Sequence, residues 1–208
     1  MLTVKDSTAE DLYNEFISLA EKEKLFDVIE DKTKLLEFLT YESNDGAKGF
    51  FYAPASTKYH GNYSGGLYEH SRQVYLRLKE LTENNKLIWS RPQSPFIVGM
   101  FHDMCKCDQY SKAYEETEYI VDGKKLCPFD KFHYEYDQKT ILKGHGSKSV
   151  ILLSQFINLT EEEMLCIRFH MGPYEQDDWD SYDKAIRKYE TVLWTNHADM
   201  LASKRDGV

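Results

Sequence analysis

The sequence predicts a mostly α-helical fold with a short β-hairpin insertion around residues 115–140. Several segments place apolar side chains at helical spacing. Two capping boxes, Ser7–Glu10 and Thr160–Glu163, mark helix starts because each pairs a hydroxyl residue with a glutamate three positions later. Between the helical segments, Asp-Gly stands between β-prone residues in 119–126, which is typical of a tight hairpin turn.

The predicted elements follow in chain order. Helices are expected where apolar periodicity is bounded by capping or breaking residues: residues 7–23, 31–43, 67–84, 94–106, 147–157, 160–170 and 183–204. Residues 44–66, rich in Gly, Ser, Asn and aromatic side chains, and residues 175–183 are expected to form loops. We expect an N-terminal helical segment, 1–45, packed on a core formed by 46–208 in one compact domain.

Composition and charge argue against several classes of protein. The chain has 208 residues, of which 41% are hydrophobic and 29% charged, as expected of a globular domain. A net charge of −9 and a pI of about 5.3 argue against a dedicated nucleic-acid binder, which usually has a basic face. The N-terminus lacks an apolar signal core, no apolar run is long enough to span a membrane, and the four cysteines form no Cys-x-x-Cys pair. We therefore expect a cytoplasmic protein with free thiols and no membrane partner.

Histidine and aspartate residues recur where predicted helices meet loops. They are His70, His102, Asp103, His145 and His170, and Asp199 lies inside the apolar last helix. Side chains at helix ends can converge at one end of a bundle, where metal sites are often built. Imidazoles and carboxylates without cysteine favour an open site for Fe, Mn, Zn, Ni or Co, and Mg suits a carboxylate-rich subsite. Hydrogen-bonded helix ends would explain the same positions, so spacing alone leaves both interpretations open.

This ordered set resembles the HD superfamily of metal-dependent phosphohydrolases, which is named for its adjacent His-Asp pair. GGLYEHS (65–71) resembles the GGLxEH signature of one branch, FHDMCK (101–106) resembles the HDxxK box, and GHGSKS (144–149) resembles a Gly-His box before the next helix. The likeness covers roughly residues 50–205. The most similar branch is the HD domain of bacterial 3′→5′ exoribonucleases, where a Pro-Ala-Ala-like segment and a histidine precede GGLxEH, as APAS (53–56) and His60 do here. Those enzymes carry an OB-fold ahead of the HD domain, whereas residues 1–45 are predicted to be helical, so compact bacterial and phage HD proteins look nearer.

The resemblance implies an HD-domain helical bundle that binds one or two divalent transition metal ions. A first metal would be bound by His70, His102, Asp103 and Asp199. A second would be bound by His145 and His170, with Asp103 bridging the two metals. Two metals can activate a shared water and clamp phosphate oxygens.

The resemblance also implies roles in catalysis and substrate binding. Asp103 and Lys106 would be catalytic, with Lys106 stabilising negative charge on phosphate, and His60, Lys106 and Lys204 would contact the substrate. The expected activity is hydrolysis of a phosphomonoester or phosphodiester, of a nucleotide or a short oligonucleotide, by a metal-activated hydroxide. Three alternatives stay open: a 3′→5′ nuclease on short single-stranded nucleic acid, a nucleotide-sensing HD protein without turnover, and a di-iron oxygenase. The sequence predicts no oligomeric state.

Overall fold

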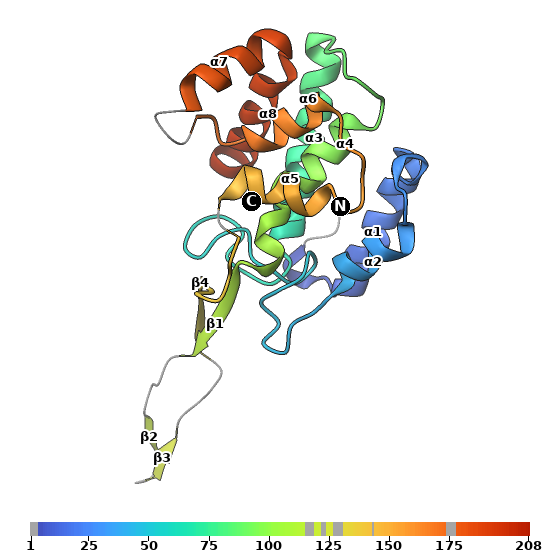
Figure 1. The fold of residues 1–208 in the computed structure, drawn as a ribbon. Coiled ribbons are helices and arrows are strands. Elements are labelled where there is room, and N and C mark those ends of the chain that lie inside the picture. Colours follow the sequence, from blue (N-terminus) through green and yellow to red (C-terminus); the bar gives the residue numbers. More distant parts are fainter. Residues whose placement is uncertain (1–3, 115–118, 122–123, 127–130, 143, 174–177) are drawn as a thin grey trace.

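The computed structural model describes residues 4–114, 119–121, 124–126, 131–142, 144–173 and 178–208, and it confirms the mostly helical class (Figure 1). The α-helices are α1 (Ala9–Lys22), α2 (Lys32–Thr40), α3 (Gly66–Asn85), α4 (Ser94–Phe101), α5 (His145–Leu153), α6 (Glu161–Arg168), α7 (Asp178–Lys188) and α8 (Thr191–Met200). The strands are β1 (Tyr110–Tyr114), β2 (Tyr119–Val121), β3 (Lys124–Leu126) and β4 (Phe132–Tyr136). Three 3₁₀ turns, η1 (Val4–Asp6), η2 (Leu25–Val28) and η3 (Met104–Asp108), and a π-helical turn, η4 (Leu201–Asp206), complete the elements. Within the described ranges, no helix is both long and apolar enough to cross a membrane.

Helix α1 begins with a capping box one residue later than predicted. The N-cap is Thr8, whose Oγ1 accepts a hydrogen bond from the Asp11 backbone N–H at 3.1 Å. The Asp11 carboxylate in turn accepts from the Thr8 N–H at 2.9 Å. The predicted cap, Ser7, instead donates its own N–H to the carbonyl of Val4 and so closes η1. An aspartate thus takes the place predicted for Glu10, because it too lies three residues after its cap.

An aromatic cluster joins the N-terminal helices to the rest of the chain. The ring of Phe16 on α1 is fully buried and lies 6.0–6.2 Å, between ring centroids, from four phenylalanines. These four are Phe50, Phe51, Phe96 and Phe101. Phe101 is the last residue of α4 and belongs to the hydrophobic core, so the next two residues, His102 and Asp103, start from a buried position.

Helices α3 and α4 pack closely and have fixed starting and ending points. A Cβ atom on Gly99 would lie 2.4 Å from the Cα of Tyr75, so only glycine permits this approach of the two helices. A Cβ atom on Gly66 would lie 2.0 Å from the carbonyl oxygen of Gly61, which fixes the start of α3 against the preceding loop. Helix α4 ends at Phe101 rather than at residue 106, since the chain tightens into the 3₁₀ turn η3.

The β insertion is a ribbon built from two antiparallel strand pairs. Strand β1 pairs with β4, from Tyr110 opposite Tyr136 to Tyr114 opposite Phe132, and β2 pairs with β3. The ribbon therefore begins at Tyr110, earlier than the predicted 115, because aromatic cross-strand pairs extend it toward the helices. The predicted Asp-Gly turn, at 122–123, lies outside the described residues. Figure 1 shows β1 and β4 leaving the helical body at its lower side.

The C-terminal region forms two helices where one was predicted. Residues 178–183, predicted as loop, belong to α7, and the chain breaks before α8 begins at Thr191. Two acidic residues of this stretch, Asp178 and Asp180, lie in the first turn of α7, where the helix dipole favours negative charge. Helix α7 buries only Tyr182 and Ala185 of its residues, so its apolar signal in the sequence is weak. Helix α5 also begins earlier than predicted, at His145, and ends at Leu153.

Candidate metal centre

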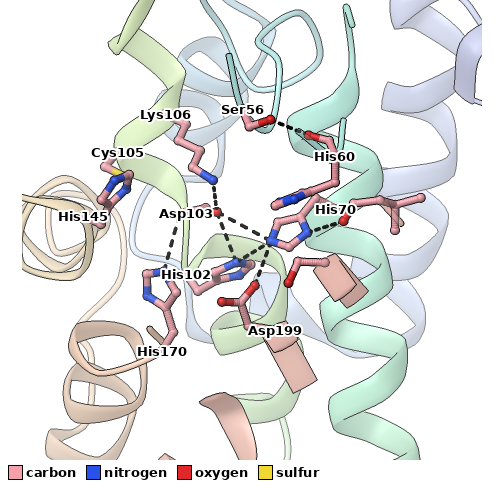
Figure 2. Close-up of polar contacts among 12 residues, drawn as sticks. Ser56, His60, His70, His102, Asp103, Cys105, Lys106, His145, His170 and Asp199 are labelled. Carbon is pink, nitrogen blue, oxygen red and sulfur yellow. Dashed lines mark hydrogen bonds and ion pairs between the residues drawn. The ribbon is translucent and has the colours of Figure 1, made fainter. Parts of the chain in front are cut away.

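Five of the six predicted metal ligands gather at one place between the helices (Figure 2). His70 lies near the start of α3, and His102 and Asp103 follow the last residue of α4. His170 follows α6 closely, and Asp199 lies in α8. Helix α4 is buried over nearly its whole length, so its C-terminal end carries His102 and Asp103 into the interior.

The side chains converge through their imidazole Nε2 and carboxylate oxygen atoms. The Nε2 atoms of His70 and His102 lie 3.2 Å apart, and Asp199 Oδ1 is 3.1 Å from His70 Nε2. Asp103 Oδ2 lies 3.6 Å from His70 Nε2 and 3.4 Å from His102 Nε2. Asp103 Oδ1 lies 3.5 Å from His170 Nε2. Asp103 is therefore the central residue of the cluster: its Oδ2 atom faces His70 and His102, and its Oδ1 atom faces His170.

Backbone oxygens fix the tautomer of three histidines. The Nδ1 atoms of His70, His102 and His170 lie 2.9, 2.9 and 2.7 Å from the backbone oxygens of Val208, Gly99 and Ile167, respectively. A carbonyl oxygen can only accept, so each Nδ1 carries the proton and donates. Each ring thereby directs Nε2 toward the cluster, and in its neutral form it presents there the lone pair that binds metals. Two such lone pairs facing each other at 3.2 Å require a proton or a metal ion between them.

Asp103 and Lys106 form a buried ion pair. Lys106 Nζ lies 2.6 Å from Asp103 Oδ2, and the two residues are only 8% and 2% exposed. Burial acts to raise the pKa of Asp103, but the Lys106 ammonium and the His102 ring hold it well below its ordinary value. Burial likewise opposes the charge of Lys106, yet Asp103 raises the lysine pKa. Asp103 Oδ1 is buried and makes no hydrogen bond of normal geometry with any residue that the structure describes; it faces His170 Nε2 at 3.5 Å.

The remaining groups of the cluster differ in charge. Burial lowers the pKa of His102, which keeps its ring neutral. Burial also opposes protonation of His170, but contact with Asp103 raises its pKa above the ordinary value. Burial acts to raise the pKa of Asp199, whereas the neighbouring His70 ring outweighs this and lowers it. The cluster therefore combines two anionic carboxylates with a neutral imidazole, that of His102, and one whose pKa is raised, that of His170.

A cavity of about 220 Å³ opens beside the cluster and brings in the predicted substrate-binding residues. His60, Lys106 and Lys204 line it together with His70, Asp103, His170 and Asp199. The ring centroid of His60 lies 5.1 Å from that of His70. Burial, with the His70 ring nearby, lowers the pKa of His60 to about 4, so this ring is neutral near pH 7. The roles of these three residues toward a substrate stay predictions.

His145, the sixth predicted ligand, lies at the edge of the cluster, with a ring nitrogen within 4.8 Å of an Asp103 carboxylate oxygen. It borders a separate cavity of about 400 Å³, next to Gln109 and Tyr136 at the base of the ribbon. Its Nδ1 lies 3.6 Å from Cys105 Sγ. Burial lowers the pKa of His145 and raises that of the Cys105 thiol to about 12. The predicted pairing of His145 with His170 on a second metal stays a prediction.

The donor set and its spacing fit a divalent transition metal. Two ligand atoms bound at about 2.0–2.2 Å to one metal lie about 2.8–3.6 Å apart for bond angles of about 90–110°. The Nε2 atoms of His70 and His102 and the Oδ2 atom of Asp103 lie 3.2–3.6 Å from one another, and Asp199 Oδ1 lies 3.1 Å from His70 Nε2. Imidazole nitrogens and carboxylate oxygens are ligands that Zn, Fe, Mn, Co and Ni accept. His70, His102 and Asp103 therefore fit one shared metal, and Asp199 adds a carboxylate beside His70, as the first metal of the HD resemblance requires.

Sequence reasoning missed several residues that shape the site. Cys105 was not considered as a ligand because it belongs to no Cys-x-x-Cys pair, although it lies two residues after Asp103. The Gly99 carbonyl accepts a hydrogen bond from His102 Nδ1 and so orients the ring. Gly99 lies three residues before His102, and this spacing can be recognised in the sequence once the helix end is predicted. Asn196, three residues before Asp199 on α8, donates from Nδ2 to the carbonyl of His170 at 2.7 Å and helps to hold that histidine.

Comparisons of the chain with protein-family models, with curated proteins and with solved structures gave no match. The functional interpretation therefore depends on the geometry of the cluster and on the motifs that supply it. Both lead to the same residues, because the sequence motifs were chosen by residue type and the structure places most of them together.

Proposed function

We propose that this protein is a metal-dependent phosphohydrolase of the HD type, acting on a phosphomonoester or phosphodiester of a nucleotide or short oligonucleotide. One observation carries the proposal: histidine Nε2 lone pairs, two carboxylates and a buried lysine meet beside an open cavity. A structural cluster of hydrogen bonds would not leave Nε2 atoms facing each other and a buried carboxylate oxygen without a hydrogen-bond donor.

The metal would be held by His70, His102, Asp103 and Asp199. When bound, a divalent metal supplies a Lewis acid that polarises phosphate and lowers the pKa of a water molecule toward neutrality. The backbone oxygens on Nδ1 keep His70 and His102 oriented, so the ligands need little rearrangement on binding. Asp103 orients the site from its centre, because its two oxygens face different histidines.

Lys106 supplies the charge for substrate binding. Its Nζ lies 2.6 Å from Asp103 Oδ2, and its side chain lines the cavity. With Asp103 serving as a metal ligand, the Lys106 ammonium would be free to contact a phosphate oxygen. There it stabilises negative charge that develops as the phosphorus–oxygen bond breaks.

The cavity supports a small phosphorylated group rather than a large ligand. Its volume of about 220 Å³ is below the range of about 300–1,000 Å³ that usually encloses a drug-sized molecule. It holds a phosphate with an adjacent sugar, and the rest of a nucleotide extends outward. Lys204 adds a second cation on the cavity wall, and neutral His60 offers hydrogen bonds. Free thiols at Cys105, Cys107 and Cys166 are compatible with a cytoplasmic location.

The test measures metal content and turnover together. The purified protein is analysed for bound metal and then assayed for phosphate release from nucleoside monophosphates, cyclic nucleotides, dinucleotides and p-nitrophenyl phosphate with Mn²⁺, Co²⁺, Ni²⁺, Fe²⁺ or Mg²⁺. We expect metal-dependent release that Asp103→Asn abolishes and that Lys106→Gln lowers by about 10²–10³-fold in kcat/KM. Lys148→Gln is the matched control, since Lys148 is equally buried and paired with Asp108 away from the cluster. Stoichiometric metal without release from any substrate would contradict the hydrolase.

The same samples separate the alternatives. A 3′→5′ nuclease would release mononucleotides from single-stranded oligonucleotides and not from small esters. A nucleotide sensor would bind a nucleotide without turnover. A di-iron oxygenase would contain iron with a mixed-valent spectroscopic signature and would consume oxygen.

A further inference from the structure

A second group of potential metal ligands lies directly against Asp103. A carboxylate oxygen of Asp103, Sγ of Cys105 and a ring nitrogen of His145 all lie within 4.8 Å of one another. Figure 2 shows Cys105 and His145 together on one side of Asp103, with His70 on the other. This group is separate from the ligands of the first metal except for the shared aspartate.

The backbone holds Cys105 and His145 in place. The backbone N–H of Cys105, in η3, donates to Ser149 Oγ at 3.0 Å, and Ser149 lies on α5, the helix that begins at His145. The start of α5 is pressed against α6, because a Cβ atom on Gly146 would lie 2.1 Å from the Arg168 carbonyl oxygen. The thiol and the imidazole are therefore positioned relative to each other by two packed elements.

The spacing of the two side chains suits a shared metal. A tetrahedral zinc with bonds of about 2.3 Å to sulfur and 2.0–2.1 Å to nitrogen places these two atoms about 3.5 Å apart. Cys105 Sγ and His145 Nδ1 are 3.6 Å apart. The third ligand atom is a carboxylate oxygen of Asp103, which lies within 4.8 Å of both. Asp103 is buried, and its Oδ1 atom makes no hydrogen bond of normal geometry among the described residues, with His170 Nε2 at 3.5 Å.

We propose that Asp103, Cys105 and His145 bind a second, thiophilic divalent metal such as Zn²⁺, Co²⁺ or Fe²⁺, with Asp103 bridging it to the first metal. The inference rests on the proposed function, since it extends the same metal centre. On binding, the S–H bond of Cys105 breaks, a sulfur–metal bond forms and the proton passes to solvent. A thiolate ligand selects against Mg²⁺, which prefers oxygen. The cavity of about 400 Å³ at His145 gives this metal access to solvent.

Titration of the metal-free protein with Co²⁺ tests the inference. Thiolate-to-cobalt charge transfer gives an absorption band in the near ultraviolet that histidine and carboxylate ligands do not give. We expect the band to grow with one of two bound equivalents. Cys105→Ala should lose the band and bind that equivalent at least tenfold more weakly, whereas Cys107→Ala should keep both, because Cys107 is equally buried but outside the ligand group.

The outcomes separate this inference from the proposed function. Two bound Co²⁺ ions without the band, or a band that persists in folded Cys105→Ala, would overturn the cysteine ligand and leave the hydrolase standing. No Co²⁺ binding at all would overturn both. If Cys105→Ala fails to fold, a variant that keeps Cys105 as its single cysteine decides the question: absence of the band there refutes the inference, and its presence supports it.

Discussion

Binding of a divalent metal should raise the melting temperature of the metal-free protein by about 5–11 °C when free metal is at 100 times its Kd. The structure gives the physical reason. The Nε2 atoms of His70 and His102 face each other at 3.2 Å, and oxygens of Asp103 and Asp199 lie 3.6 and 3.1 Å from His70 Nε2. A metal ion binds only this folded arrangement, because the ligands come from α3, the end of α4 and α8 and are far apart in an unfolded chain.

The magnitude follows from binding linkage. A ligand at 100 times its Kd that binds only the folded state adds about 2.7 kcal/mol to the free energy of unfolding. For a domain of about 150–250 residues, each kcal/mol shifts the melting temperature by about 2–4 °C. The product is the range of about 5–11 °C. A second metal at the cysteine-containing subsite would add to this shift only with metals that bind thiolate.

The assay is thermal unfolding followed by circular dichroism after chelation and again after addition of Co²⁺ or Zn²⁺. Asp103→Asn removes the central carboxylate and should abolish the shift. Glu163→Gln is the matched control, since Glu163 is a buried carboxylate paired with Arg91 at 2.7 Å, outside the cluster. It should lower the melting temperature of both forms but keep the difference between them. Equal melting with and without metal, or equal loss of the shift in both variants, would refute the metal centre.

Three further predictions concern affinity and stability. Affinity for a metal that takes His170 as a ligand, as the resemblance implies, should weaken by up to about tenfold per pH unit as the pH falls through the pKa of His170, which Asp103 raises, because a protonated imidazole cannot bind metal; affinity that is flat between pH 6 and 8 would contradict this. Gly99→Ala should lower the free energy of unfolding, measured in urea, by about 1–3 kcal/mol, because the new Cβ would lie 2.4 Å from the Tyr75 Cα. An unchanged urea midpoint would disprove the close contact. Phe16→Ala should cost about 3–5 kcal/mol in the same assay, as its ring is fully buried, and a loss below 1 kcal/mol would mean that the N-terminal helices do not share the core.

Local signals in the sequence predicted most helices well. The capping box at Thr160–Glu163 is formed as expected, with the threonine Oγ1 accepting from the Glu163 N–H at 3.2 Å and the glutamate accepting from the Thr160 N–H at 2.9 Å. Such signals work because both partners lie within one helical turn. The helix α7 was missed for the opposite reason. It is polar and largely exposed, buries only Tyr182 and Ala185, and has surface ion pairs such as Lys184 with Asp180, so its composition is like that of a loop.

The candidate site was predictable by residue type but not by arrangement. Four histidines and two aspartates were identified, most of them where predicted helices meet loops, and five of the six meet in space, because helices that share a core bring their ends together. The position of His145 beside Cys105 could not be predicted, since it depends on how η3 packs against α5. A contact between elements about forty positions apart leaves no periodic signal, and only the thiol's position two residues after Asp103 could have drawn attention to it.

Two helix ends build the metal centre in the same way. Phe101-His102 and Phe169-His170 each place a buried phenylalanine directly before a histidine at or just past the end of a helix. In both cases the histidine Nδ1 donates to the carbonyl three residues upstream, one of the carbonyls that a helix end leaves without an intrahelical donor. The helix end therefore supplies the hydrogen-bond acceptor that fixes the tautomer and aims Nε2 inward. The same ends carry the negative pole of each helix dipole, which favours a cation at the point where the two Nε2 atoms meet Asp103. The repeated arrangement explains why a Phe-His pair after an apolar helix is the most informative part of this sequence: the phenylalanine anchors the helix end in the core, and the helix end orients the histidine.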